Sequence, residues 1–164
     1  MKFVDRTEEQ ERLSTAINSK SPSLVVVFGR RRIGKSTLIK KVLSPADVYY
    51  MADQTERPHQ IELLAKEISM RFEGFDRVIY PDWEALFEGL NYRTTEQFTL
   101  CLDEFPYLAK SSPELPSLLQ KMIDAKTLKY NLIICGSSQQ LMQGLALEST
   151  SPLYGRANQV LKIS

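Results

Sequence analysis

The chain has 164 residues, enough for one domain with a substantial core, and its 43% hydrophobic and 25% charged residues are ordinary for a globular protein. A formal net charge of +1 excludes a global charge excess that would recruit nucleic acid or an anionic membrane, so any such contact needs a local patch. No apolar stretch approaches the roughly 18 residues of a membrane span, and no apolar h-region marks a signal peptide. Cys101 and Cys135 lie inside apolar runs and are predicted to be buried thiols, which suits a reducing cytoplasm.

Amphipathic and apolar segments alternate from the start of the chain. A helix is predicted over 6–19, because Thr7 and Gln10 fit a capping box and an apolar stripe follows them. The run 24–28 is apolar and mostly β-branched, which is typical of a strand buried on both faces. A second helix is predicted over 35–43, directly after a loop that contains two glycines.

The same alternation continues to the end of the chain. The pattern predicts strands over 47–52, 97–104, 131–138 and 158–164, and helices over 57–72, 82–92, 114–128 and 138–147. Strands that alternate with helices form a parallel sheet covered on both faces, and such sheets bind ligands beyond the carboxyl ends of their strands. We therefore expect a three-layer α/β sandwich around a five-stranded, mostly parallel sheet, in one domain over 1–164 with its core over 23–164.

The segment 29–36 matches the phosphate-binding pattern G-x-x-x-x-G-K-[ST] between a predicted strand and a predicted helix. Gly29 and Gly34 permit the backbone conformations that aim successive N–H groups at a pyrophosphate. The helix that follows adds its unpaired N–H groups and the positive end of its dipole. Lys35 should reach the β- and γ-phosphates as a catalytic point charge, and the Ser36 hydroxyl should ligate Mg²⁺.

The loop between the two glycines holds Arg30, Arg31, Arg32 and Ile33. Its backbone should face the phosphates, as should the first turn of the helix at Thr37, whereas the arginine side chains should point outward. Those side chains could contact the nucleotide, a neighbouring subunit or nucleic-acid phosphates, or they could form a solvated or ion-paired loop. One short basic run on a nearly neutral chain is weak evidence for nucleic-acid binding.

The predicted strand 97–104 ends in Asp103 and Glu104. Beside a phosphate-binding loop, Asp103 is predicted to hold Mg²⁺ and Glu104 to act as the general base that polarises an attacking water. Ser137 or Ser138, at the end of the next strand, could sense the γ-phosphate or orient the water, and helix capping by Ser137 is the alternative. The chain contains no N-K-x-D guanine-reading motif, so the expected nucleotide is ATP.

Four segments together resemble the prokaryotic and archaeal AAA-type ATPases related to the STAND class, the archaeal ATPase-domain family. They read FVDRTEEQERL (3–13), VVVFGRRRIGKSTLI (25–39), TLCLDEFPYL (99–108) and SPLYGRANQVLKI (151–163). The resemblance implies an ASCE-type P-loop NTPase sheet, with an extra strand between the P-loop strand and the Asp103 strand, and it implies ATP and Mg²⁺. It also implies that Val4 and Arg6 lie by the adenine and that Arg156 approaches the phosphates as a sensor or finger. From the residues alone, Arg156 is a lone arginine after a Tyr-Gly turn, and a surface or packing arginine is the alternative.

One departure from this family concerns the C-terminal side. Family members continue from the nucleotide domain into a helical lid or winged helix, whereas this sequence stops at Ser164, so we expect an absent lid and a fragment of a longer protein. The favoured function is Mg-dependent ATP hydrolysis that acts as a switch or motor for an output domain or assembly, with homo-oligomers among the candidate partners. The alternatives are a small-molecule P-loop kinase and a nucleic-acid-associated ATPase module.

Overall fold

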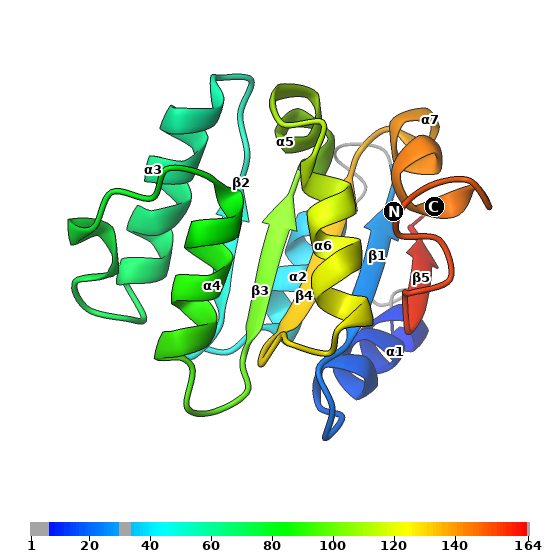
Figure 1. The fold of residues 1–164 in the computed structure, drawn as a ribbon. Coiled ribbons are helices and arrows are strands. Elements are labelled where there is room, and N and C mark those ends of the chain that lie inside the picture. The colour runs from blue at the N-terminus through cyan, green and yellow to red at the C-terminus, as the bar shows by residue number, and fades with distance from the viewer. Residues whose placement is uncertain (1–6, 30–33, 164) are drawn as a thin grey trace.

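The computed structural model describes residues 7–29 and 34–163 (Figure 1). Its elements, in chain order, are α1 (Thr7–Ile17), β1 (Leu24–Phe28), α2 (Lys35–Val42), β2 (Val48–Met51), α3 (Arg57–Ser69), η2 (Phe75–Arg77), α4 (Trp83–Arg93), β3 (Thr99–Asp103), α5 (Phe105–Ser111), α6 (Leu115–Asp124), β4 (Asn131–Gly136), α7 (Gln139–Met142), the π-helical turn η3 (Gln143–Leu147) and β5 (Gln159–Lys162). The expected nucleotide contacts at Val4, Arg6, Arg30, Arg31, Arg32 and Ile33 fall outside the described residues.

The five strands form one sheet in the order β2-β3-β4-β1-β5, and each neighbouring pair is parallel. β4 lies between β1 and β3, so the extra strand implied by the family resemblance is confirmed. The register pairs Phe28 of β1 with Gly136 of β4, which brings the carboxyl ends of these strands to the same edge. All neighbouring strands of the sheet are parallel, whereas the sequence predicted a mostly parallel sheet.

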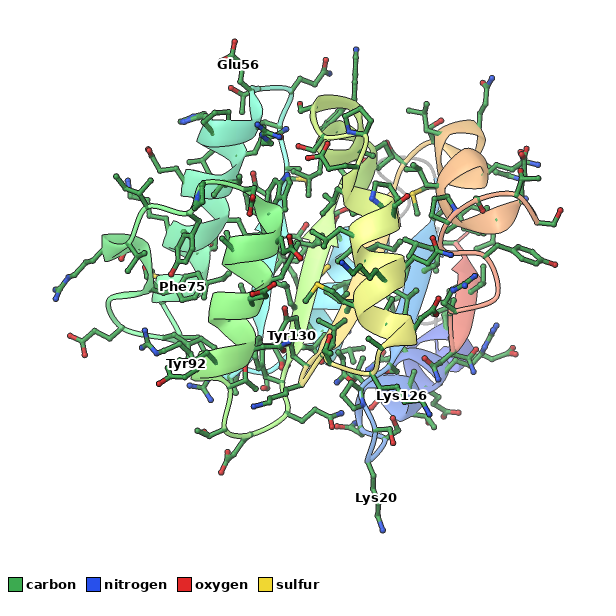
Figure 2. The ribbon with its side chains drawn as sticks, in the orientation of Figure 1. Lys20, Glu56, Phe75, Tyr92, Lys126 and Tyr130 are labelled. Atoms are coloured by element: carbon green, nitrogen blue, oxygen red, sulfur yellow. The ribbon has the colours of Figure 1, made fainter. Side chains whose placement is uncertain are left out.

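Helices cover both faces of the sheet, as expected for a three-layer sandwich (Figure 1). Alternate residues of each strand face opposite layers: Val26 packs with the cluster that includes α3, α4, α5 and α6, whereas Val25 packs with α1 and α2. Strands buried on both faces need apolar residues at every position, which explains the unbroken apolar runs in the sequence. Phe75 and Tyr130 lie in the first cluster, and Lys20, Glu56 and Tyr92 extend into solvent (Figure 2).

Two predicted helices differ from the observed ones, and one observed helix was not predicted. The helix expected over 114–128 ends at Asp124, and Lys126 adopts a left-handed conformation with φ 57°, which a helix cannot continue through. The helix expected over 138–147 is split into α7 and η3. α5 was not predicted at all, because seven residues are too few to show a helical period.

Cys101 and Cys135 are both buried and free, as predicted, with their Sγ atoms 3.7 Å apart under α2. Across residues 7–29 and 34–163, no helix combines the length and the apolar character needed to span a bilayer.

Candidate nucleotide-binding site

The site begins where β1 ends and α2 starts. Gly34 precedes the helix with φ 89° and ψ 10°, a left-handed conformation that favours glycine, and its carbonyl accepts from the Leu38 N–H at 2.8 Å. At the other end of the loop, the Gly29 N–H donates to the Gly136 carbonyl at 3.2 Å. Leu38 and Ile39 anchor α2 in the core, so its N-terminus is fixed over the carboxyl edge of the sheet.

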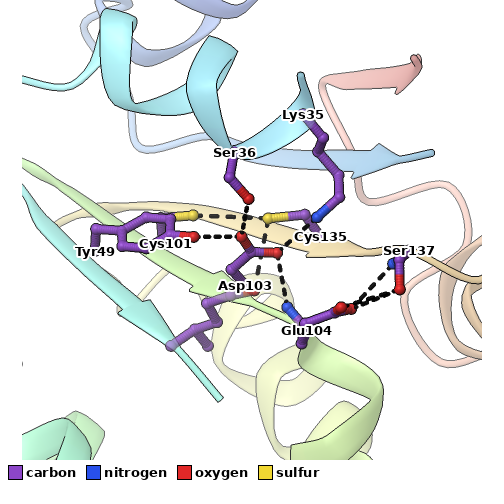
Figure 3. Close-up of polar contacts among 9 residues, drawn as sticks. Lys35, Ser36, Tyr49, Cys101, Asp103, Glu104, Cys135 and Ser137 are labelled. Atoms are coloured by element: carbon purple, nitrogen blue, oxygen red, sulfur yellow. Dashed lines mark hydrogen bonds and ion pairs between the residues drawn. The ribbon is translucent and has the colours of Figure 1, made fainter. Parts of the chain in front are cut away.

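Asp103, at the end of β3, gathers the predicted site residues around its carboxylate (Figure 3). Its Oδ1 accepts from Lys35 Nζ at 2.9 Å and its Oδ2 from the Ser36 hydroxyl at 2.8 Å. Lys35 is 5% exposed and Asp103 is fully buried, so this ion pair is largely shielded from water. The structure therefore brings Lys35, Ser36 and Asp103 together, whereas Thr37 lies on the exposed side of the same turn.

Both members of this ion pair are held in their charged forms. Burial alone would raise the pKa of Asp103, but hydrogen bonds from Lys35 and Tyr49 outweigh it, and the net pKa is lowered. Burial alone would lower the pKa of Lys35, but the hydrogen bond and negative charge of Asp103 help to raise it. The Cys135 thiol beside them is neutral, because complete burial and the contact with Cys101 raise its pKa well above the usual value.

Glu104 is held by the end of the neighbouring strand. Its backbone lies in the left-handed region (φ 54°, ψ 45°), which is uncommon for a residue other than glycine, and its N–H donates to Asp103 Oδ1 at 2.8 Å. Its carboxylate accepts from the Ser137 N–H at 3.0 Å and from the Ser137 hydroxyl at 2.9 Å. Ser138 accepts from the Leu141 N–H at 3.2 Å and caps α7, so capping belongs to Ser138 and the alternative proposed for Ser137 is wrong.

Tyr49 belongs to the site, although no motif in the sequence indicates it. Its hydroxyl donates a hydrogen bond to Asp103 Oδ2, the oxygen that also accepts from Ser36. Burial and the bond to Asp103 raise the pKa of Tyr49, so the phenol stays a neutral donor. The feature that would identify Tyr49 as a site residue is the parallel register of β2 and β3, which pairs Tyr49 with Cys101. A single sequence does not reveal which strands pair.

A cavity of about 610 Å³ opens beside this network. It is lined by Gly34, Lys35, Ser36, Thr37, Met51, Ala52, Asp53, Gln54, Glu104 and Tyr107, so it extends from the start of α2 past Glu104 to the carboxyl end of β2. Gln60 joins two of its walls, because its side-chain amide donates to the carbonyls of Asp53 at 3.0 Å and Tyr107 at 3.3 Å.

The oxygen donors of the site fit Mg²⁺. The Ser36 hydroxyl and the Asp103 carboxylate are 2.8 Å apart at the N-terminus of α2. Hydroxyl and carboxylate oxygens are ligands that this hard cation prefers. Within the described ranges, no group of three or more His, Cys, Asp or Glu side chains could hold a metal by itself.

Arg156 does not lie at this site, which corrects the expectation that it approaches the phosphates of its own chain. Its guanidinium forms two hydrogen bonds with the Asp124 carboxylate, at 3.0 and 2.9 Å. It lines a separate hollow with Leu24 and Asn158, at the amino ends of β1 and β5. The Tyr-Gly turn before it thus leads into the opposite edge of the sheet from Lys35.

Comparison with known proteins places this geometry in a family. The uncharacterized protein MJECL04 of Methanocaldococcus jannaschii is 37% identical over 164 residues, which cover 98% of this chain and 35% of that protein. The fold is similar to the Aeropyrum pernix ORC1 protein solved in complex with DNA (TM-score 0.70, 17% identity, 97% of this chain and 45% of that one). It is also similar to the STAND protein PH0952 of Pyrococcus horikoshii, which has a tetratricopeptide-repeat sensor (TM-score 0.59, 17% identity, 98% and 23%).

These likenesses confirm the predicted P-loop NTPase fold. The chain spans about a third of the length of MJECL04 and less than half of both solved structures. Its residues 3–164 match the model of a family described as an ATPase domain predominantly from Archaea, and the chain therefore belongs to that family.

Proposed function

We propose that this domain binds ATP with Mg²⁺ and hydrolyses it. The observation that carries the proposal is the network in which Lys35, Ser36 and Asp103 meet at the carboxyl edge of the sheet, beside a cavity that Glu104 also lines. The membership of an ATPase-domain family supports the same conclusion.

Each residue has a role that follows from its chemistry. Lys35 would exchange the Asp103 carboxylate for the β- and γ-phosphates, and Ser36 and Asp103 would hold Mg²⁺, which would supply positive charge to stabilise the phosphates. Glu104 would accept a proton from the attacking water, and Ser137 would fix the direction of the Glu104 carboxylate through its two hydrogen bonds. The ion pair between Lys35 and Asp103 keeps the lysine buried and charged before nucleotide arrives.

The experiment is a calorimetric titration with ATP and Mg²⁺, paired with a phosphate-release assay. Lys35→Ala should weaken ATP binding about 100-fold, because a charged hydrogen-bond donor to phosphate is lost. Glu104→Gln should bind ATP within about threefold of the wild type and lose about 100-fold or more in turnover. Lys41→Ala, which removes an exposed ammonium from the same helix, is the control and should bind normally. Unchanged ATP affinity in Lys35→Ala would overturn the proposal.

At the scale of the whole protein, we propose that hydrolysis in the cytoplasm switches an attached output domain or an assembly of subunits. The support is the greater length of MJECL04, of which this chain covers 35%. A nucleic-acid partner is the second candidate, because ORC1, whose fold is similar, was solved in complex with DNA. DNA binding that weakens steeply with added salt would favour this candidate, and its absence in a full-length protein would remove it.

A further inference from the structure

Four donors converge on the Asp103 carboxylate, two on each oxygen. Oδ1 accepts from Lys35 Nζ and from the Glu104 N–H, and Oδ2 accepts from the hydroxyls of Ser36 and Tyr49. A carboxylate offers about four lone-pair positions, so these four donors fill it. A new ligand of Asp103 must therefore displace one of them.

The four donors are not equally free to leave. Lys35 and Ser36 belong to the P-loop helix, and under the proposed function both turn toward the phosphates and Mg²⁺. The Glu104 N–H is backbone, one residue along the chain from Asp103. Tyr49 lies on β2, whose parallel pairing with β3 aligns it with Cys101, so its distance from Asp103 is set by the sheet.

We propose that Tyr49 is a positioning residue for the metal, whose hydroxyl holds the Asp103 carboxylate in a metal-binding orientation. With Lys35 and Ser36 withdrawn, one donor remains on each oxygen: the Glu104 N–H on Oδ1 and the Tyr49 hydroxyl on Oδ2. These two bonds fix the plane of the carboxylate and leave one free position on each oxygen for Mg²⁺ or its water. The inference deepens the proposed function and depends on it.

The surroundings of Tyr49 suit this role. The side chain is half-buried between α2 and the sheet, where the ammonium of Lys40 lies 4.8 Å from the centre of its ring. A cation over the face of an aromatic ring is attracted to it, so Lys40 helps to hold the ring in place. Without the hydroxyl, the Asp103 carboxylate could rotate about its side-chain bond once Lys35 and Ser36 leave. Ordering the carboxylate would then reduce the free energy of Mg²⁺ binding.

The experiment compares Tyr49→Phe with Tyr50→Phe. Tyr50 is the next residue of β2; it faces the opposite layer, is 3% exposed and has its hydroxyl 3.5 Å from the Gln60 carbonyl, so the control removes a buried hydroxyl away from Asp103. For each protein, the affinity for a non-hydrolysable ATP analogue is measured by calorimetry in EDTA and across a Mg²⁺ titration. Thermal unfolding of each variant verifies that it is folded.

We expect metal-free analogue affinity to stay within about twofold in both variants. The Mg²⁺ concentration at half-maximal enhancement should rise about tenfold in Tyr49→Phe and stay within about twofold in Tyr50→Phe, as for other residues that orient a metal ligand. An unchanged or lower Mg²⁺ midpoint in Tyr49→Phe would overturn the inference and leave the proposed function standing. Failure of the wild type to bind the analogue with or without Mg²⁺ would instead overturn the proposed function.

Discussion

Gly136 ends β4 at the point where two other chain segments come close to its Cα. A methyl group there would lie 2.9 Å from Met142 Sδ, closer than real Cβ atoms come, and 3.0 Å from Pro106 Cδ, which is tighter than nearly all real Cβ contacts. Its carbonyl also accepts from the Gly29 N–H at the start of the P-loop. The lack of a side chain therefore lets α5 and α7 approach the strand that carries Ser137.

Gly136→Ala should lower the free energy of unfolding by about 1–3 kcal/mol, because the rigid ring of Pro106 has to move. Urea denaturation measures this as a lower midpoint at constant slope. Gly144→Ala is the matched control: a methyl group at Gly144 meets nothing within 4 Å, and stability should stay equal or rise by up to about 1 kcal/mol. Equal stability of the two variants would contradict the packing argument.

Residues of the site differ in how far the sequence could predict them. Lys35 and Ser36 were predictable because one contiguous motif holds them, and Asp103 because an acid ends an apolar strand. Tyr49 was not, because its role depends on which strand lies beside β3. The expected position of Arg156 beside the phosphates of its own chain came only from the family resemblance and is wrong, because the structure pairs Arg156 with Asp124.

At the scale of elements, α4 shows how a predicted helix is tied to its neighbours. The sequence predicted a helix over 82–92, and α4 covers Trp83–Arg93 with Trp83 1% exposed. Asp82 caps it by accepting from the Ala85 N–H at 2.8 Å. The indole N–H of Trp83 donates to the hydroxyl of Ser112, between α5 and α6, at 2.8 Å. This hydrogen bond between distant segments could not be predicted from the sequence.

Ser112→Ala should destabilise the domain by about 1–3 kcal/mol, because it leaves the buried indole N–H of Trp83 without this acceptor. Ser117→Ala, on the exposed side of α6, removes the same hydroxyl from a solvated position and should change stability by less than about 0.5 kcal/mol. Chemical denaturation of both variants gives the comparison. A Ser112→Ala protein as stable as Ser117→Ala would show that the indole bond contributes little.

At the scale of the whole molecule, the parallel sheet separates two edges with different side chains. The carboxyl edge holds the network of Lys35, Asp103 and Glu104, and the amino edge holds the hollow lined by Leu24 and Arg156. The parallel sheet and its binding edge followed from the alternation of strands and helices. The position of β4 between β1 and β3 followed only from the family resemblance, because spatial order depends on how the helices pack.

Bound nucleotide should therefore raise the free energy of unfolding through contacts at the carboxyl edge of the sheet. At about 100 times its dissociation constant, Mg-ATP should add about 2.7 kcal/mol to the free energy of unfolding, which in a domain of this size raises the melting temperature by about 5–10 °C. Hydrogen exchange should slow in α2 and at the carboxyl ends of β3 and β4, and should change little around Leu24 at the amino edge. At the same ATP concentration Lys35→Ala should gain only about 0.4 kcal/mol and little protection, because its affinity is about 100-fold weaker. The same temperature rise in Lys35→Ala, or protection centred on the amino edge, would mean that ATP binds somewhere other than the P-loop.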